Sequence, residues 1–240
     1  MPLSMSLRKS KTIIALVAVL GLSVVGSPAA ASGVDGSNQS AKSANGEQAR
    51  SRALAAIKKA TLQFADVNNA LDAGYVSTVD LGAGCVSSES EGGPRQLGGM
   101  GIHFVKLDEI GAPESDFMTP SVLVYAPDPD VEHCSYSTGE LMTNYDCADS
   151  LRLVAVEELI FAHLWQPASG EAHWEAPPEF HGNQFYYVHD NPETDWVDEA
   201  HAFPPHYELH IWLYEHNPAG LFAAWNPTIS CPAHMQGGHH

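Results

Sequence analysis

The chain has 240 residues and a formal net charge of −18, from 29 acidic residues against 11 Lys and Arg. So acidic a surface repels nucleic-acid phosphates and anionic lipids, and we expect neither as a partner. The length is sufficient for one sizeable domain with tails. No Lys or Arg follows Arg152, whereas eleven histidines and twelve acidic residues do. This half of the chain indicates either a solvated acidic surface or a histidine–carboxylate cation site.

Residues 1–31 have the features of a secretory signal peptide. Basic residues (Arg8, Lys9 and Lys11) precede a short apolar core, and small residues follow at 29–31. The core is shorter than the roughly 20 residues of a membrane span, and no lipidation cysteine follows it. We therefore expect a soluble domain that is secreted or extracytoplasmic. Residues 32–48 are rich in Ser, Gly, Asn and Ala, which predicts a disordered linker.

The four cysteines of an exported chain are expected to form disulfides. Cys134 and Cys147 lie in one polar excursion, so we predict that they pair. Cys85 and Cys231 would then tie the start of the domain to its end. A four-cysteine zinc site is the weaker alternative, because the spacing contains no close CxxC pair.

The remaining elements are predicted from periodicity. Residues 49–73 form an Ala- and Leu-rich helix that ends before Gly74, and a glycine-rich loop occupies 75–99. Five strands follow, at 101–106, 121–126, 151–158, 185–188 and 207–214. A long polar and aromatic loop covers 166–205. The prediction is an α+β domain over residues 49–232, with an N-terminal helix packed on an antiparallel sheet or small β-sandwich with long polar loops. Residues 233–240 are predicted to be a flexible tail containing histidines.

The strand at 207–214 carries the candidate chemistry. With a two-residue period, its apolar side chains share one face and possible ligands share the other. The possible ligands are His206, Glu208 and His210, followed by Trp212 and Tyr214. By the rise of a strand, His206 and His210 lie about 13 Å apart, too far to share one ion on a straight strand. Only on a helix would they lie one turn apart and be able to share it.

A metal site in this chain therefore needs side chains from several strands. Either His206 or His210 would join His103 and a carboxylate from the end of a buried strand, Glu157 or Glu158. The predicted ligand set is His103, Glu158, His206, Glu208 and His210. The ion would be divalent, such as zinc, and no other cofactor is expected. Neither an HExxH metalloprotease motif nor a GxSxG nucleophile elbow is present, so no catalytic residue is assigned.

Three stretches resemble a family of exported bacterial proteins without an assigned function. They are GMGIHF at 99–104, LRLVAVEEL at 151–159, and the stretch from HYELHIWL to NPAGLF within 206–225, with the closing Cys231. The resemblance covers most of residues 50–232. It implies a secreted domain of one piece and no catalytic residue, and 131–149 is an insertion relative to the family pattern.

Two functions follow as expectations. The first is an exported domain that binds a divalent metal through His and Glu side chains. The second is a non-catalytic extracellular domain that binds a ligand or a surface without metal, in which the histidines are ordinary core residues. The density of histidines and carboxylates also predicts a surface that gains positive charge below pH of about 6.5. Enzymatic activity, the ligand and the oligomeric state stay open.

Overall fold

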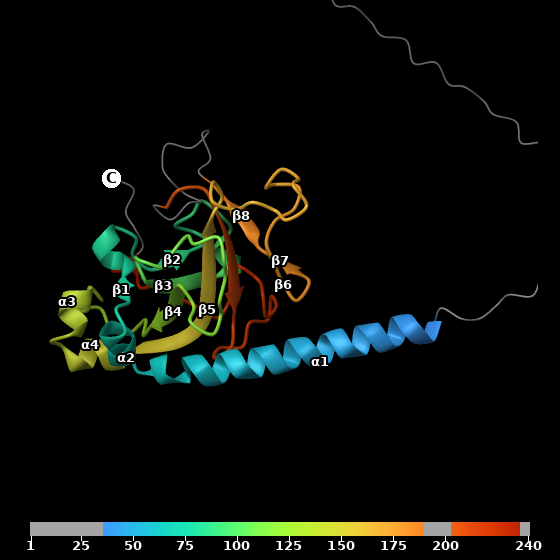
Figure 1. Ribbon diagram of the computed structural model, residues 1–240. Helices are drawn as coiled ribbons and strands as arrows, with labels where there is room; N and C mark the ends of the chain where they lie inside the picture. The colour runs from blue at the N-terminus through green and yellow to red at the C-terminus, as the bar shows by residue number, and fades with distance from the viewer. Residues whose placement is uncertain (1–35, 190–202, 236–240) are drawn as a thin grey trace, which may run out of the picture. The chain divides into compact units, whose positions relative to one another are not determined.

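A seven-stranded antiparallel sheet forms the centre of the fold (Figure 1). The computed structural model describes residues 36–189 and 203–235, so the predicted signal peptide lies outside the described residues. The strand order is β1-β3-β4-β5-β9-β8, and β2 pairs with the other part of β3. The strands are β1 (Val76–Ser77), β2 (Val86–Ser87), β3 (Gly99–Val105), β4 (Val122–Pro127), β5 (Leu151–Phe161), β8 (Tyr186–Val188) and β9 (His206–Ile211). A separate two-stranded sheet contains β6 (Glu179–Phe180) and β7 (Asn183–Gln184).

The five predicted strands are all present, and the α+β fold class is confirmed. The last strand is shorter than predicted, because the chain turns after Ile211. There the N–H of Leu213 bonds to the carbonyl of Ile211, and the N–H of Trp212 bonds to Leu221. Tyr214 therefore does not share the face of His210. Its hydroxyl instead lies 2.8 Å from Thr61 Oγ1, at the end of the N-terminal helix.

The N-terminal helical region differs from the prediction at both ends. Helix α1 (Gly36–Thr61) begins inside the predicted disordered linker, so that prediction is wrong for residues 36–48. The predicted helix also does not run unbroken to residue 73. A 3-10 turn, η1 (Leu62–Ala65), follows α1, and Asp66 is extended and caps α2 (Val67–Asp72) by accepting from Asn68 N. Gly74, with φ of 89°, closes the region as predicted.

Short helical turns complete the described chain. They are η2 (Thr78–Leu81), η3 (Arg95–Leu97), α3 (Thr138–Leu141), α4 (Tyr145–Asp149) and η4 (Ala233–Met235). The last of these lies in the predicted flexible tail. Because Met235 is buried and its carbonyl accepts from Cys85 N, the ordered domain extends at least to Met235. Residues 236–240 lie outside the described residues.

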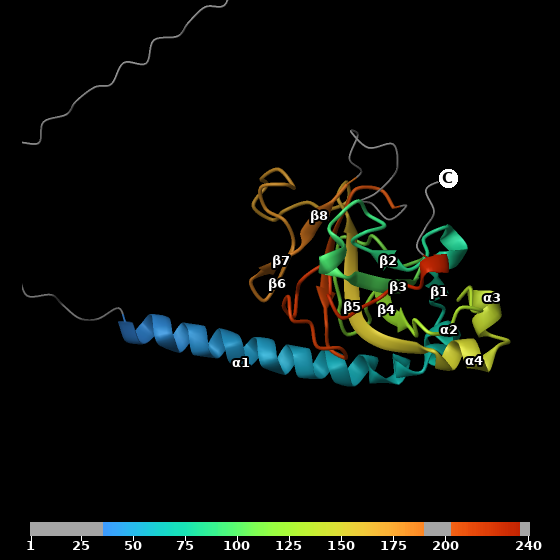
Figure 2. The ribbon, with the colours of Figure 1, turned by 180° about the vertical axis from the view of Figure 1, so that it is seen from behind.

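The two faces of the sheet carry different side chains, which we call the helix face and the histidine face. On the helix face Phe104, Leu123 and Leu209 pack with Ile57 of α1 and Val67 of α2. The histidine face has a second apolar cluster, which is rich in valine, and it also carries the candidate ligands of β9. This second cluster includes Val105, Val122, Val124, Ala155, Leu159, Trp212 and Ile229. Figure 2 shows β3, β4 and β5 from behind, next to one another.

Both predicted disulfides are present. Cys134–Cys147 closes the excursion that contains α3 and α4, with a Cα–Cα distance of 5.6 Å. Cys85–Cys231 joins the segment before β2 to the segment after β9, at 5.5 Å. Chain entropy predicts that they stabilise the fold by about 3 and about 5 kcal/mol, because the second closes the much longer loop.

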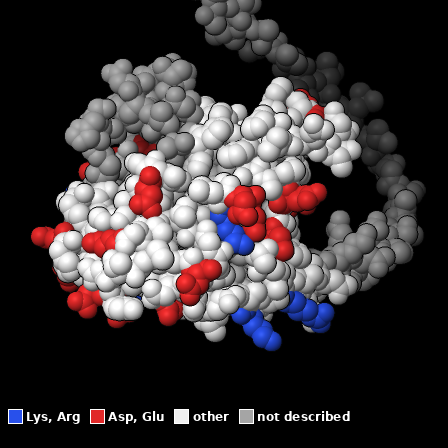
Figure 3. Space-filling model, turned by 60° about the vertical axis from the view of Figure 1, so that its left-hand side comes forward, with Lys and Arg blue, Asp and Glu red and all other residues white. Residues whose placement is uncertain are grey.

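The chain divides into two compact units, Met1–Ser40 and Ala41–His240, and the sheet belongs to the second unit. Within the described ranges, no helix is both long and apolar enough to cross a membrane. Figure 3 shows acidic side chains spread over one face of the molecule with few basic ones among them. The last basic residue of the chain, Arg152, forms an ion pair with Glu215. Such exposed pairs contribute little stability, so the fold depends on its two apolar clusters and its disulfides.

Candidate metal centre

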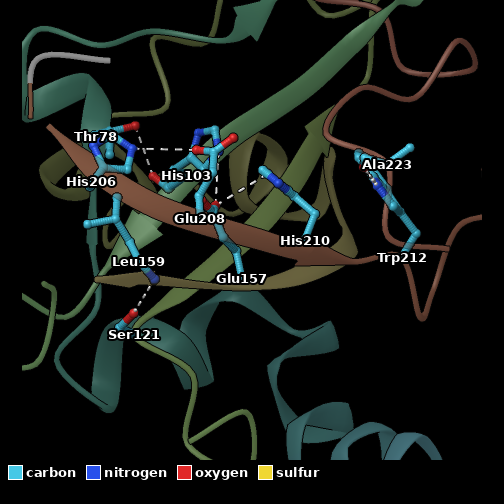
Figure 4. Close-up of polar contacts among 10 residues, drawn as sticks. All are labelled: Thr78, His103, Ser121, Glu157, Leu159, His206, Glu208, His210, Trp212 and Ala223. Carbon is cyan, nitrogen blue, oxygen red and sulfur yellow. Dashed lines mark hydrogen bonds and ion pairs between the residues drawn. The ribbon is translucent and has the colours of Figure 1, made fainter. Parts of the chain in front are cut away.

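Three strands of the sheet each bring one possible ligand to the histidine face. In the register of the sheet, Glu157 of β5 lies opposite His210 of β9. His103 of β3 lies opposite Val124, which in turn lies opposite Ala155, two residues before Glu157. Because side chains alternate along a strand, His103, Glu157 and His210 all point to this face. Figure 4 shows them converging from their three strands.

The ligand atoms of these three residues lie close together. Glu157 Oε2 is 3.3 Å from His103 Nε2 and 3.4 Å from His210 Nε2. All three atoms lie within 4.8 Å of one another. Ligand–metal bonds of about 2.0–2.1 Å in a tetrahedron separate neighbouring ligand atoms by about 3.3–3.4 Å. Charge-assisted hydrogen bonds are shorter, about 2.7–2.9 Å. The two Oε2–Nε2 distances therefore match the edges of a tetrahedral metal coordination shell.

The centre is buried in apolar surroundings. The side chains of His103, Glu157 and His210 are 8%, 2% and 0% exposed. A small hollow beside His103 and Glu157 offers about 10 Å³ to the centre of a water molecule. That is space for about one water and for nothing larger. The other residues lining it are Thr78, Ala83, Val86, Val105, Val122, Leu159 and Phe203.

The residues around the ligands hold them to different degrees. Thr78 Oγ1 donates to the main-chain carbonyl of His103 at 3.0 Å. The ring of His210 stacks on Trp212 with centroids 5.8 Å apart, and the Trp212 indole donates to Ala223 O at 2.7 Å. The Nδ1 atom of His210 has no hydrogen-bond partner among the described residues. Metal-binding histidines usually have such a partner, and its loss weakens binding by about 10–100-fold.

His206 and Glu208 form a separate pair on the same face. The Nδ1 atom of His206 lies 2.8 Å from the carbonyl of Pro204, and because a carbonyl only accepts, Nδ1 is the donor. The other ring nitrogen of His206, Nε2, lies 3.5 Å from Glu208 Oε2. The two side chains are 0% and 2% exposed. The rise of a strand correctly indicated that His206 and His210 do not meet at one ion, and the three-residue cluster contains neither His206 nor Glu208.

Glu158 lies on the opposite face of the sheet, so the carboxylate of the cluster is Glu157. The Glu158 carboxylate accepts from Ser121 N and Asp116 N, both at 3.3 Å, and from Ser121 Oγ at 3.0 Å. Burial raises the pKa of Glu158 to about 7 even though these hydrogen bonds lower it. The sequence signal, two acidic residues at the end of an apolar strand, could not show which one faces the histidines.

A second group of possible ligands has no thiolate to offer. His133 lies beside Cys134 and Cys147, and the three ligand atoms are within 4.8 Å of one another. Both sulfurs are joined in the disulfide, whereas metals bind the deprotonated thiol. The His103–Glu157–His210 cluster is therefore the stronger candidate in the described part of the chain.

Comparison with protein-family models, with curated proteins and with solved structures gives no match. The resemblance to a family of exported proteins thus stays a prediction. Two imidazole nitrogens and one carboxylate oxygen form a group that could hold a metal ion.

Proposed function

We propose that this protein is an exported domain that binds one divalent transition-metal ion through His103, Glu157 and His210. The single observation that supports it best is the approach of Glu157 Oε2 to two imidazole Nε2 atoms at 3.3 and 3.4 Å. Export is supported by the signal-like N-terminus and by the two disulfides.

The energetics of burial favour a cation at this position. A carboxylate that is almost fully buried costs several kcal/mol unless opposite charge accompanies it. Neutral imidazoles supply no net charge, and the described basic side chains include none in the lining of the hollow. A divalent ion would place positive charge beside Glu157 and accept the lone pairs of both rings. Imidazole and carboxylate donors suit zinc, iron, nickel and copper, and the tetrahedral spacing favours zinc.

The size of the hollow limits the chemistry of the centre. The hollow beside His103 and Glu157 accepts about one water, which a bound zinc would polarise. A substrate larger than water does not fit between Thr78, Leu159 and Phe203. We therefore propose metal binding, with a structural or metal-holding role, in preference to turnover of a bulky substrate.

The test is metal analysis of protein in which His239 and His240 are replaced by alanine, so that the tail cannot bind metal. After chelation and zinc repletion, we expect one zinc per chain. His103→Ala and His210→Ala should each abolish stoichiometric binding, because each removes one of three ligands. His163→Ala is the matched control, since His163 is exposed and outside the cluster.

Two results would overturn the proposal. One is substoichiometric zinc in the unmodified centre. The other is zinc content that is unchanged by His103→Ala and by His210→Ala. In that case the cluster is a metal-free network in which a protonated imidazole accompanies Glu157, and the variants would lose only stability.

A further inference from the structure

A cleft separate from the metal centre opens beside β8 and β9. Its volume is about 370 Å³, within the range of roughly 300–1,000 Å³ of small-molecule sites. Its walls come from the loop between β2 and β3, from β8, and from the segment after β9. The lining residues are Ser88, Glu91, Gly93, Pro94, Leu97, Met100, Tyr186, Tyr187, Val188, Glu208, Ala224 and Trp225. None of them lines the hollow of the metal centre.

The cleft combines aromatic rings with a buried carboxylate. Tyr186 lies opposite Glu208 in the register of β8 and β9, so both side chains point to the histidine face. Tyr187 points the other way, because its ring packs 5.2 Å from Tyr207. The rings available to a ligand are therefore those of Tyr186, which is 47% exposed, and Trp225. Glu208 is only 1% exposed, and its contact with His206 holds the carboxylate in place.

The charge of the cleft has one sign. Its lining contains two carboxylates, Glu91 and Glu208, and no Lys or Arg. Arg95, the basic residue nearest in sequence, lines a different hollow and pairs with Glu89 at 3.6 Å. An anionic ligand would be repelled by two carboxylates with no Lys or Arg among the described lining residues, whereas a cation would be attracted to both.

We propose that this cleft binds a small organic cation, an ammonium group carried on an apolar body. Ammonium groups are attracted to the faces of Tyr and Trp rings, and the attraction increases when the group is shielded from water. The apolar body would pack on Met100, Leu97 and Val188, and the charge would lie near Glu208. The cleft proposal does not depend on the metal proposal, because the two sets of lining residues are distinct.

The test compares choline with 3,3-dimethylbutan-1-ol, which has the same shape without the charge, by isothermal titration calorimetry on the chelated full chain. We expect choline to bind, and the uncharged compound to bind about tenfold more weakly. Glu208→Gln keeps the shape of the side chain and removes its charge. It should weaken choline binding about tenfold, as should Tyr186→Ala, which truncates a half-exposed ring without opening the core.

Tyr145→Ala is the matched control, because Tyr145 is 72% exposed on α4, outside the cleft lining. A thermal melt of each variant checks that it is folded. The proposal is overturned if choline does not bind, if both compounds bind equally, or if Glu208→Gln and Tyr186→Ala bind like Tyr145→Ala. His103→Ala separates the two proposals, because it should lose zinc and keep choline binding.

Discussion

Glu157 and Glu158 are neighbours in one strand, yet they lie in opposite environments. On the histidine face, Glu157 meets the Nε2 atoms of His103 and His210. On the helix face, Glu158 meets only neutral donors, two main-chain N–H groups and the Ser121 hydroxyl. Both carboxylates are buried, at 1% and 4% exposure. The difference between the faces is therefore the chemistry of the partners and not the degree of burial.

The two faces of the sheet therefore differ in what their side chains do. The helix face stabilises the fold through large apolar side chains, and the pKa of Glu158, which is buried there, is raised towards the protonated form. The histidine face has its own apolar cluster and carries the buried His and Glu side chains that could hold a cation. The following predictions, from the largest expected effect to the smallest, test whether the two faces act independently.

Leu209→Ala should lower the free energy of unfolding by about 4 kcal/mol, because it leaves a cavity on the helix face. Urea denaturation measures the change, and Leu107→Ala, at a 57% exposed residue, is the control, with a change within about 0.5 kcal/mol. Zinc affinity of the folded variant should stay the same, since Leu209 points away from His210. A parallel loss of zinc affinity would show that the faces are coupled.

Glu158 should make stability decrease as pH rises. Its pKa in the folded protein is about 7, raised from 4.5 by burial, so the folded state binds this proton more tightly than the unfolded chain does. Stability from this group is complete below pH 4.5 and is lost as pH rises to about 7, with a total change of about 3 kcal/mol.

The variant Glu158→Gln isolates this effect. Its amide oxygen can accept from Ser121 N and Asp116 N, while its NH₂ group donates to Ser121 Oγ. In chelated protein the variant should match the parent at acid pH and exceed its stability at pH 8. Urea denaturation at several pH values measures the difference in the free energy of unfolding between variant and parent. For the control Glu132→Gln, at an exposed residue, this difference should not change with pH. If the stability difference between Glu158→Gln and the parent also did not change with pH, the raised pKa of Glu158 would be contradicted.

Glu157→Gln should weaken zinc binding by about 100-fold or more, since loss of a direct ligand exceeds the 10–100-fold cost of losing a supporting contact. Competition with a chromophoric chelator measures the affinity. Glu158→Gln is the adjacent control and should bind zinc like the parent. An equal loss of zinc affinity in Glu157→Gln and Glu158→Gln would mean that the substitutions disturb β5 as a whole, and that direct contact between Glu157 and the metal is not the cause.

Tyr75→Phe should have the smallest effect, about 1 kcal/mol lower stability, because the Tyr75 hydroxyl donates to the carbonyl of Pro120 at 2.5 Å. Burial raises the pKa of the Tyr75 phenol, so the hydroxyl stays protonated at neutral pH and can donate this hydrogen bond. Thermal unfolding detects the change, and Tyr145→Phe at an exposed ring should be neutral. Loss of zinc binding in Tyr75→Phe would contradict the separation of the faces.

Much of the fold could be predicted from local patterns. Apolar runs located the strands, and the pairing of Cys134 with Cys147 followed from their position in one excursion. The break at Asp66 was missed, because a single capping residue gives a weak signal inside an apolar periodic segment. The helical character of residues 36–48 was also missed, since their Ser, Gly and Asn content is typical of linkers.

The candidate site could be predicted only in part. Alternation along β9 correctly placed His206, Glu208 and His210 on one face, and the strand rise separated His206 from His210. The choice between Glu157 and Glu158 depends on the register between β5 and β9, which no local pattern contains. The cleft was missed for a similar reason, because Glu91, Tyr186 and Trp225 are far apart in the sequence.

The strand order also determines when the centre can form during folding. β3, β4 and β5 are consecutive strands of the chain and pair as neighbours, so His103 and Glu157 meet through two pairings between successive strands. His210 joins them through the pairing of β9 with β5, whose closest partners, Phe161 and His206, are further apart in the sequence than those of β4 and β5. An ion that binds all three ligands therefore selects chains whose last strand has docked. Metal binding would therefore stabilise the chain only after β9 has paired with β5, and it would favour this late step of folding and not the early collapse.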